Sequence, residues 1–340
     1  MKKLNLLSMI FSVAAVTALI FVAACTKEGP KGDPGEDGID GTDGTATCGV
    51  CHDNSETVET AIGQWEHSKH GFGGTNFENR TTCAPCHTSQ GFKEALALDS
   101  SATAVAVQNP ASINCYTCHK IHDTYSASDW ELRVTAPDAF WLTGETVDLG
   151  KANLCLKCHQ PRISYQIPDV TNPEGTYEVT SSRFGPHHGP QGTSLNGLAF
   201  YMVGSGYMNS SHAGIENACI TCHMASPIGY VAGGHSWIME DEEEGLNTAG
   251  CLECHTADEA EQLKEELNAE IEASMTELGT LLATAGILNP TAVNAVPGTY
   301  TNKVAGAYWN FISIVEDKSG GVHNPKFIKK IIENSIASLE

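Results

Sequence analysis

Basic side chains are scarce in this chain of 340 residues: 19 lysines and arginines stand against 41 aspartates and glutamates, for a formal net charge of −22. Such a surface repels phosphate groups, which argues against nucleic acid or an anionic bilayer as a partner surface. Aromatic residues make up only 7% of the chain. No apolar run after residue 24 approaches the roughly 20 residues that span a bilayer.

Cysteine is almost absent outside one repeated pattern. Of 13 cysteines, 12 lie in Cys-x-x-Cys-His motifs, and Cys25 is the thirteenth, so no pair is left for a structural disulfide. A lone Cys-x-x-Cys is ambiguous between a redox disulfide and a zinc half-site. Here a histidine directly follows the second cysteine in every copy, whereas zinc sites place their histidines at other spacings. The six motifs begin at Cys48, Cys83, Cys115, Cys155, Cys219 and Cys251.

This signature is the attachment motif of c-type haem, in which two thiols add across the vinyl groups of one macrocycle. The sequence therefore predicts six covalently attached c-type haems, whose bulk would fill much of a core that has few aromatic side chains. The attachment residues are Cys48, Cys51, Cys83, Cys86, Cys115, Cys118, Cys155, Cys158, Cys219, Cys222, Cys251 and Cys254. The histidine of each motif is the expected proximal iron ligand: His52, His87, His119, His159, His223 and His255.

Eight other histidines are candidates for the opposite face of each iron. A histidine there gives low-spin iron suited to electron transfer, whereas an open position permits substrate binding. His187 and His188 are adjacent, and the preference for His188 is slight; the role of His67 stays open. We expect the distal ligands to be His70, His122, His188, His212, His235 and His323.

Two more side chains near the motifs are candidates for contacts to haem. Arg162 follows His159 closely, and its guanidinium matches the carboxylate of a propionate, although a surface salt bridge is the alternative. Met224 directly follows His223, and methionine can be a sixth ligand. The histidines suffice in number, so we do not assign Met224 to an iron.

The first 25 residues are typical of a targeting segment, with two lysines before an apolar run from Leu6 to Ala24. Val22-Ala23-Ala24-Cys25 resembles a bacterial lipobox, in which the cysteine is lipidated and becomes the mature N-terminus. An ordinary signal peptide or an uncleaved anchor helix is the alternative. Thr26 follows, which by resemblance to Gram-negative lipoprotein sorting permits the outer membrane. We expect export and a lipid anchor at Cys25, on the periplasmic face or the cell surface.

Four regions follow from these patterns: a signal peptide over 1–25, a tether over 26–47, a six-haem domain over 48–256 and a helical region over 257–340 packed on that domain. In the tether, glycine recurs at every third position from Gly29 to Gly44, as in collagen. Five triplets rich in acidic residues favour an extended, solvated tether. A trimerising stalk is the alternative.

The fold class expected is mainly α with little regular secondary structure. The motif spacing fits a short helix and a loop for each haem, and loose alternation predicts small β-hairpins within 130–150 and 177–180. An apolar stripe at helical spacing, from Leu263 to Leu282, predicts a long helix ended by Gly286 and Pro290. A second helix is expected over about 305–315. Asn324-Pro325 is typical of the start of a last one.

From about Cys48 to the C-terminus, the chain resembles the multihaem cytochrome c superfamily that includes cytochrome c nitrite reductase and hydroxylamine oxidoreductase. The resemblance implies a mostly helical fold with closely packed haems and electron hopping between them. The chain has no Cys-x-x-Cys-Lys motif, which marks many nitrite reductases, and no cross-linking tyrosine is placed. The segments that carry the resemblance are Trp65-x-x-Ser68-x-His70, Cys118-His119-x-x-His122, Cys158-His159-Gln160-x-Arg162, His187-His188-Gly189-Pro190-Gln191, Cys222-His223-Met224 with Gly234-His235, and Gly321-Val322-His323-Asn324-Pro325.

Three functions are compatible with six haems. The first is an electron carrier that exchanges electrons with other redox proteins or an extracellular acceptor. The second is a reductase of a small nitrogen or sulfur oxyanion at one open haem. The third is a subunit of a haem-stacked filament. Bis-histidine ligation favours the first, and the spin state of the irons separates it from the second.

Overall fold

The structure is a computed structural model that describes His52 and residues 55–72 and 79–340. The expected targeting segment, the lipidation site Cys25, the tether and the first-motif thiols of Cys48 and Cys51 lie outside the described residues. Within the described ranges the chain is mostly helical, with long irregular stretches and small two-stranded sheets. This confirms the expected fold class.

Short helices begin the described part of the chain. Polar caps start two of them: the Ser55 hydroxyl accepts from the amide of Val58, and the Thr88 hydroxyl accepts from the amide of Gly91. The motif helices last about one turn, because the Cys-x-x-Cys spacing closes within a turn. These elements are α2 (Glu56–His67), η2 (Lys69–Gly71), α3 (Ala84–His87), α4 (Ser89–Leu98), α5 (Cys115–Cys118) and η3 (Ala127–Trp130).

The middle of the chain alternates small strands with single helical turns. Strand β1 pairs antiparallel with β2, which confirms a hairpin within 130–150. The elements are β1 (Asp138–Ala139), β2 (Thr146–Val147), η4 (Gly150–Ala152), α6 (Asn153–Leu156), β3 (Thr176–Val179), α7 (Gln191–Asn196), η5 (Ser211–Gly214), α8 (Ala218–His223), η6 (Gly234–Ser236), β4 (Glu240–Asp241) and β5 (Gly245–Leu246).

The hairpin expected at 177–180 is wrong, because the strand at this place pairs with a distant segment of the chain. Strand β3 forms there, but it pairs antiparallel with β8 (Gly298–Thr301), so that Thr176 lies opposite Thr301. Alternation of side chains reveals that a segment is extended, whereas the strand that completes its hydrogen bonds can come from anywhere in the chain. The pairing ties the motif region to the C-terminal region.

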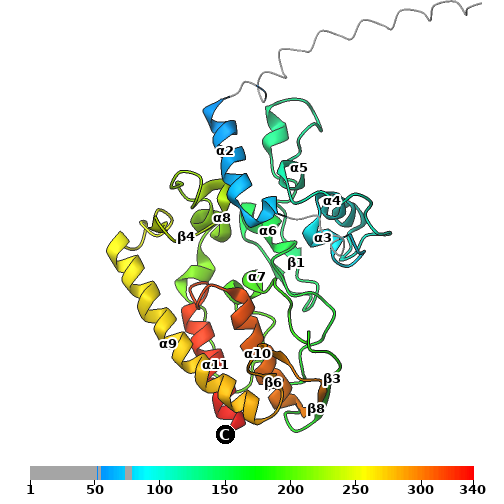
Figure 1. Cartoon of the computed structure of the whole chain (residues 1–340), viewed down its shortest axis with the longest axis vertical. Helices are drawn as coiled ribbons and strands as arrows, with labels where there is room; N and C mark the ends of the chain where they lie inside the picture. Colours follow the sequence, from blue (N-terminus) through cyan, green and yellow to red (C-terminus); the bar gives the residue numbers. More distant parts are fainter. Residues whose placement is uncertain (1–51, 53–54, 73–78) are drawn as a thin grey trace, which may run out of the picture. The chain divides into compact units, whose positions relative to one another are not determined.

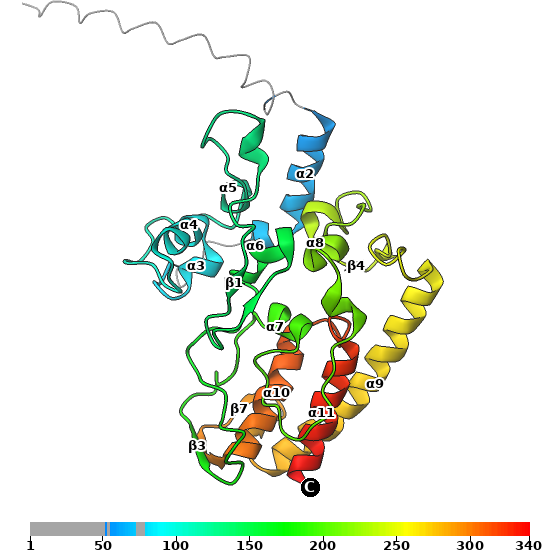
Figure 2. The same ribbon diagram turned by 180° about the vertical axis from the view of Figure 1, so that it is seen from behind.

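Three helices pack side by side at the C-terminal end, as Figures 1 and 2 show: α9 (Ala257–Thr284), α10 (Asn302–Asp317) and α11 (Pro325–Leu339). A capping box of Thr256 and Glu259 starts α9. The expected apolar stripe is buried at Leu267, Ile271, Leu278 and Leu282. All three predicted helices are confirmed. A small hairpin of β6 (Leu288–Asn289) and β7 (Asn294–Ala295) precedes β8.

The largest apolar core surrounds these helices. It joins residues of α9, α10 and α11 to Val179, Phe184 and Phe200 from the motif region. The Trp309 indole donates to the carbonyl of Ala199, and the Asn310 amide donates to the carbonyl of Tyr201. The polar atoms of these two buried side chains are therefore paired across the two regions. Within residues 55–72 and 79–340, none of the helices combines the length and apolar character needed to cross a membrane.

Gly306 makes a close contact in this core. A Cβ atom there would lie 2.2 Å from Cγ of Tyr201, whose side chain is fully buried. We expect Gly306→Ala to lower the free energy of unfolding by about 1–3 kcal/mol, the usual cost of overpacking. Urea unfolding followed by circular dichroism measures it. Gly214→Ala is the matched control, since no described atom lies within 4 Å of its added Cβ; equal loss in both variants would contradict the packing argument.

Candidate haem-binding site

A cavity of about 2190 Å³ runs through the motif region. Pockets for small ligands usually measure about 300–1,000 Å³, so this cavity has room for several large groups. All ten described motif cysteines and all six motif histidines line it. The lining also includes seven other histidines: His70, His122, His187, His188, His212, His235 and His323.

Large apolar side chains line the cavity without protein atoms to cover them. Phe72 is 71% exposed, Tyr125 62% and Leu263 49%, and all three belong to the lining. Uncovered apolar surface of this kind marks a binding site. Apolar walls for a macrocycle, paired thiols for covalent attachment and imidazoles for iron are therefore all present. The residues fit c-type haem.

Motif histidines face non-motif histidines across this cavity. In five pairs the ring centroids lie 6.2 or 6.3 Å apart, and each pair joins one motif histidine to one histidine from elsewhere in the chain. The pairs are His52 with His122, His87 with His187, His119 with His235, His159 with His70, and His223 with His323.

That spacing has a chemical meaning. With a metal–nitrogen bond of about 2.0 Å and about 1.15 Å from each ring nitrogen to its centroid, two imidazoles on opposite sides of one ion stand about 6.3 Å apart. Direct ring contact would bring the centroids closer, as for His187 and His188 at 4.3 Å. Each of the five pairs can thus hold one iron between its rings.

Hydrogen bonds at Nδ1 orient many of these rings. His119 donates to the Trp130 carbonyl over 2.6 Å, and His223 donates to the Trp237 carbonyl over 2.9 Å. A carbonyl oxygen can only accept, so Nδ1 carries the proton and Nε2 keeps its lone pair for a metal. In motif four, His159 is 3.1 Å from the side-chain oxygen of Gln191, which holds it in the same way.

The structure differs from the sequence-based preference for His188. His187 lies opposite His87, the histidine of motif two, because its backbone adopts a φ of 68° that turns the ring that way. His188 is 64% exposed at its side chain, and its Nδ1 lies 2.6 Å from the Glu316 carboxylate. The geometry therefore gives the facing position to His187.

Burial keeps several of these imidazoles neutral, which is the form that binds a metal. Burial, and then the charge of His159, lower the pKa of His70 to about 4. Burial, followed by the positive charge of Arg162 and neighbouring histidines, lowers the pKa of His187 to about 3. His323 differs: burial opposes its charged form, but the Asp317 carboxylate outweighs burial and raises the pKa.

His255 and His212 form no ring pair of this spacing within the described ranges, although both line the cavity. The His212 Nδ1 donates to the Val322 carbonyl over 2.6 Å, the same pattern as in the paired rings. His67 stacks on Tyr230 with centroids 6.0 Å apart and bonds to the Gly63 carbonyl. These contacts hold His67 on its own helix.

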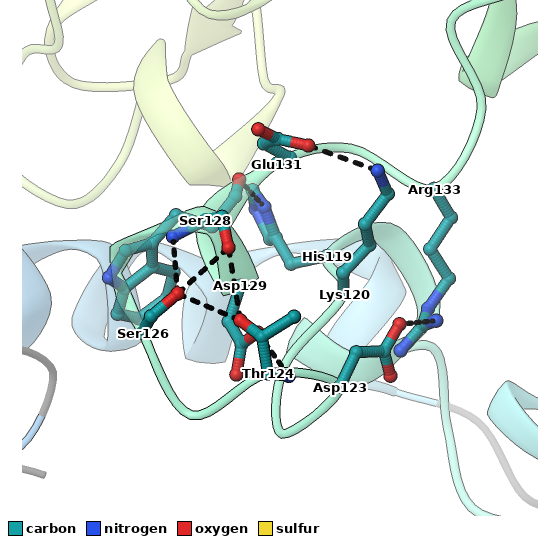
Figure 3. A network of polar contacts seen from close by, with 10 residues as sticks. His119, Lys120, Asp123, Thr124, Ser126, Ser128, Asp129, Glu131 and Arg133 are labelled. Atoms are coloured by element: carbon teal, nitrogen blue, oxygen red, sulfur yellow. Dashed lines mark hydrogen bonds and ion pairs between the residues drawn. The ribbon is translucent and has the colours of Figure 1, made fainter. Parts of the chain in front are cut away.

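Figure 3 shows the polar network that shapes the loop after motif three. The buried Asp129 carboxylate accepts from the amide and hydroxyl of Thr124, over 2.8 and 2.7 Å, and from the amide of Tyr125 over 3.0 Å. His122 has a φ of 62° and stacks on the Tyr125 ring with centroids 5.1 Å apart. The loop thus presents His122 to His52.

Arg162 carries an unpaired buried donor. Its Nε is buried and has no hydrogen-bond partner among the described protein atoms. The side chain lines the cavity beside His187. A guanidinium in this position matches a carboxylate such as a haem propionate, which makes a plain surface salt bridge the weaker interpretation.

Contacts between motifs place them in a spatial order. Cys158 of motif four lies 3.7 Å from the Pro85 carbonyl of motif two, and its thiol packs with Cys118 of motif three on one apolar cluster. Cys155 interacts with Cys219 of motif five. A Cβ on Gly250, just before motif six, would lie 2.6 Å from the carbonyl of Thr221 in motif five. With His52 facing His122, the motifs follow the order one, three, four, five, six, and motif two lies beside four.

Sequence reasoning missed Gln191 and Asp317, which contact imidazole rings, and Asp129, which shapes the loop that carries His122. The signal for Gln191 was present, since it lies in the His-His-Gly-Pro-Gln segment quoted for the resemblance. Asp129 and Asp317 are single acidic residues among many, so only the structure distinguishes them.

No protein-family model and no curated protein matches the chain. Among solved structures, the chain is similar to the crystal structure of the outer cell wall cytochrome OcwA, with a TM-score of 0.51 and 18% sequence identity. The match covers 82% of this chain and 50% of the other, so the chain spans about half the length of that protein. At this identity the similarity concerns the fold alone.

Proposed function

We propose that the chain is a hexahaem c-type cytochrome that carries electrons along bis-histidine haems at the bacterial cell envelope. The observation that carries this proposal is the set of five histidine pairs at 6.2 or 6.3 Å within one cavity. Haem iron held in this way is low-spin and exchanges single electrons. The thiols of the six motifs attach the groups.

The proposed distal ligands follow from the ring pairs. His122 serves motif one, His187 motif two, His235 motif three, His70 motif four and His323 motif five. For motif six, we assign His212 to the iron bound by His255, because its Nδ1 is held by Val322 and its ring lines the cavity. Arg162 would bind a propionate near motif two.

The proposed site of action is outside the cytoplasm. Cys25 would carry a lipid anchor in the outer membrane, and the glycine-rich segment would separate the haem domain from the membrane. The similarity to a protein described as an outer cell wall cytochrome supports a place at the envelope. Other redox proteins or an extracellular acceptor are the proposed partners. Contacts that join all six motifs into one series support transfer between such partners.

A reductase at one open haem is the second candidate. The observation in its favour is His255, whose ring faces no other imidazole at the required spacing within the described residues. An iron with an exchangeable sixth position there would bind a small oxyanion or carbon monoxide.

Mass spectrometry and EPR test both candidates. We expect the intact denatured protein, matured with a complete attachment system, to carry six haems, one for each motif. We expect the oxidised protein to show low-spin signals alone and the reduced protein to bind no carbon monoxide. Five or fewer haems would contradict the motif count. A high-spin signal in the unaltered protein that is the same size in His212→Ala would show that His212 is not a ligand and would favour the reductase.

A further inference from the structure

Asp317 is a buried carboxylate in direct contact with a paired imidazole. Its Oδ1 lies 2.8 Å from Nδ1 of His323, and only 3% of the residue is exposed. Its second oxygen accepts from the Ser319 hydroxyl. The carboxylate is therefore held by two donors on one side of the cavity.

The turn between α10 and α11 is shaped to make this contact. Asp317 is the last residue of α10, and His323 lies just before α11. Between them Lys318, Gly320 and Gly321 adopt positive φ values of 59°, 59° and 90°. Two glycines take this conformation without strain, so the chain reverses within a few residues and returns His323 to Asp317.

Four of the other paired rings, those of His119, His122, His159 and His223, have a neutral group at Nδ1. These groups are the carbonyls of Trp130 and Trp237, the amide oxygen of Gln191 and the hydroxyl of Tyr116. His188 also contacts a carboxylate, that of Glu316, but it is exposed and faces no motif histidine. Among the described residues, a buried carboxylate thus meets a paired ring at Asp317.

We infer that Asp317 is a positioning residue that lowers the reduction potential of the haem of motif five. The inference rests on the proposed bis-histidine cytochrome. A carboxylate that accepts the Nδ1 proton makes the imidazole a stronger electron donor. Its negative charge, buried in a medium of low dielectric constant, also favours ferric over ferrous iron. His223, which would bind the same iron, already donates to a carbonyl, so both histidines would be stronger electron donors.

Asp317→Asn tests the inference, because it removes the charge and retains an oxygen that can accept from Nδ1. We expect one haem to shift to a more positive potential in a spectroelectrochemical titration, with six haems by mass and only low-spin EPR signals. Glu178→Gln, at an exposed position of β3, is the matched charge control and should shift none. Asp317→Glu keeps the carboxylate, so this haem should retain a reduction potential close to that of the unaltered protein.

Ser319→Ala provides an independent and opposite test. Removing the hydroxyl leaves Asp317 more strongly bound to His323, so the same haem should shift to a more negative potential. Unchanged potentials in Asp317→Asn would overturn the inference, and so would conversion of that haem to high spin, since Asp317 would then only hold His323 in place. If Asp317→Asn does not accumulate, Ser319→Ala decides alone, and no shift overturns the inference. A haem count below six would instead overturn the proposed function.

Discussion

His187→Ala is expected to convert one haem from low spin to high spin, whereas His188→Ala leaves every haem low-spin. His187 faces His87 across 6.2 Å, the spacing for two imidazoles on one iron, while His188 points to Glu316. An open iron binds carbon monoxide, so the His187 variant should gain one binding equivalent. EPR of the oxidised protein and carbon monoxide titration of the reduced protein measure the change.

The two adjacent histidines are matched controls for each other. They share the same chain segment, so a general disturbance of that segment would affect both variants alike. High spin in His188→Ala and low spin in His187→Ala would reverse the assignment and restore the preference drawn from the sequence. Low spin in both variants would show that either ring can replace the other.

Removal of both motif-four thiols, Cys155→Ala with Cys158→Ala, is expected to abolish the folded protein. Motif four contacts motifs two, three and five, and its histidine, His159, is half-buried. Truncating one buried aromatic side chain lowers the free energy of unfolding by about 3–5 kcal/mol. A haem macrocycle is larger than such a side chain, so its loss should lower this free energy by more. Domain stabilities are only about 5–15 kcal/mol, so the variant should not accumulate as a folded protein.

The corresponding change in motif one, Cys48→Ala with Cys51→Ala, is the control. His52 of that motif faces His122 at the end of the series, so the protein should fold with five haems. Size-exclusion chromatography and intact mass measure both variants. Equal yields would contradict the central place of motif four.

The C-terminal helices were predictable because their signals are local. The stripe from Leu263 to Leu282 and the Asn324-Pro325 start are sufficient to place α9 and α11. Leu263 is instructive, since the stripe predicts burial but protein atoms leave it 49% exposed, on the cavity wall. Its position at the cavity shows that an apolar side chain of a helix can contact a bound group instead of the protein core.

Pairings across the chain were not predictable from local patterns. The Cys-x-x-Cys-His signature identifies the motif histidines, but nothing near His159 shows that its facing ring is His70. Likewise, the alternation around Tyr177 reveals strand β3 without its partner β8. The choice between His187 and His188 depends on one backbone dihedral angle. Two adjacent histidines look alike in the sequence, so the sequence does not show which of them adopts that angle.

The C-terminal segment has a consequence for assembly. A chain made from its N-terminus exposes all six motifs before β8, Val322 and His323 have been synthesised, and contacts between such distant residues form late because long loops close slowly. The haem attachment apparatus would therefore act on an open chain. The pairing of β3 with β8 and the binding of His323 to the haem of motif five would then come last. A chain shortened before β8 should therefore carry its haems but should not fold around them.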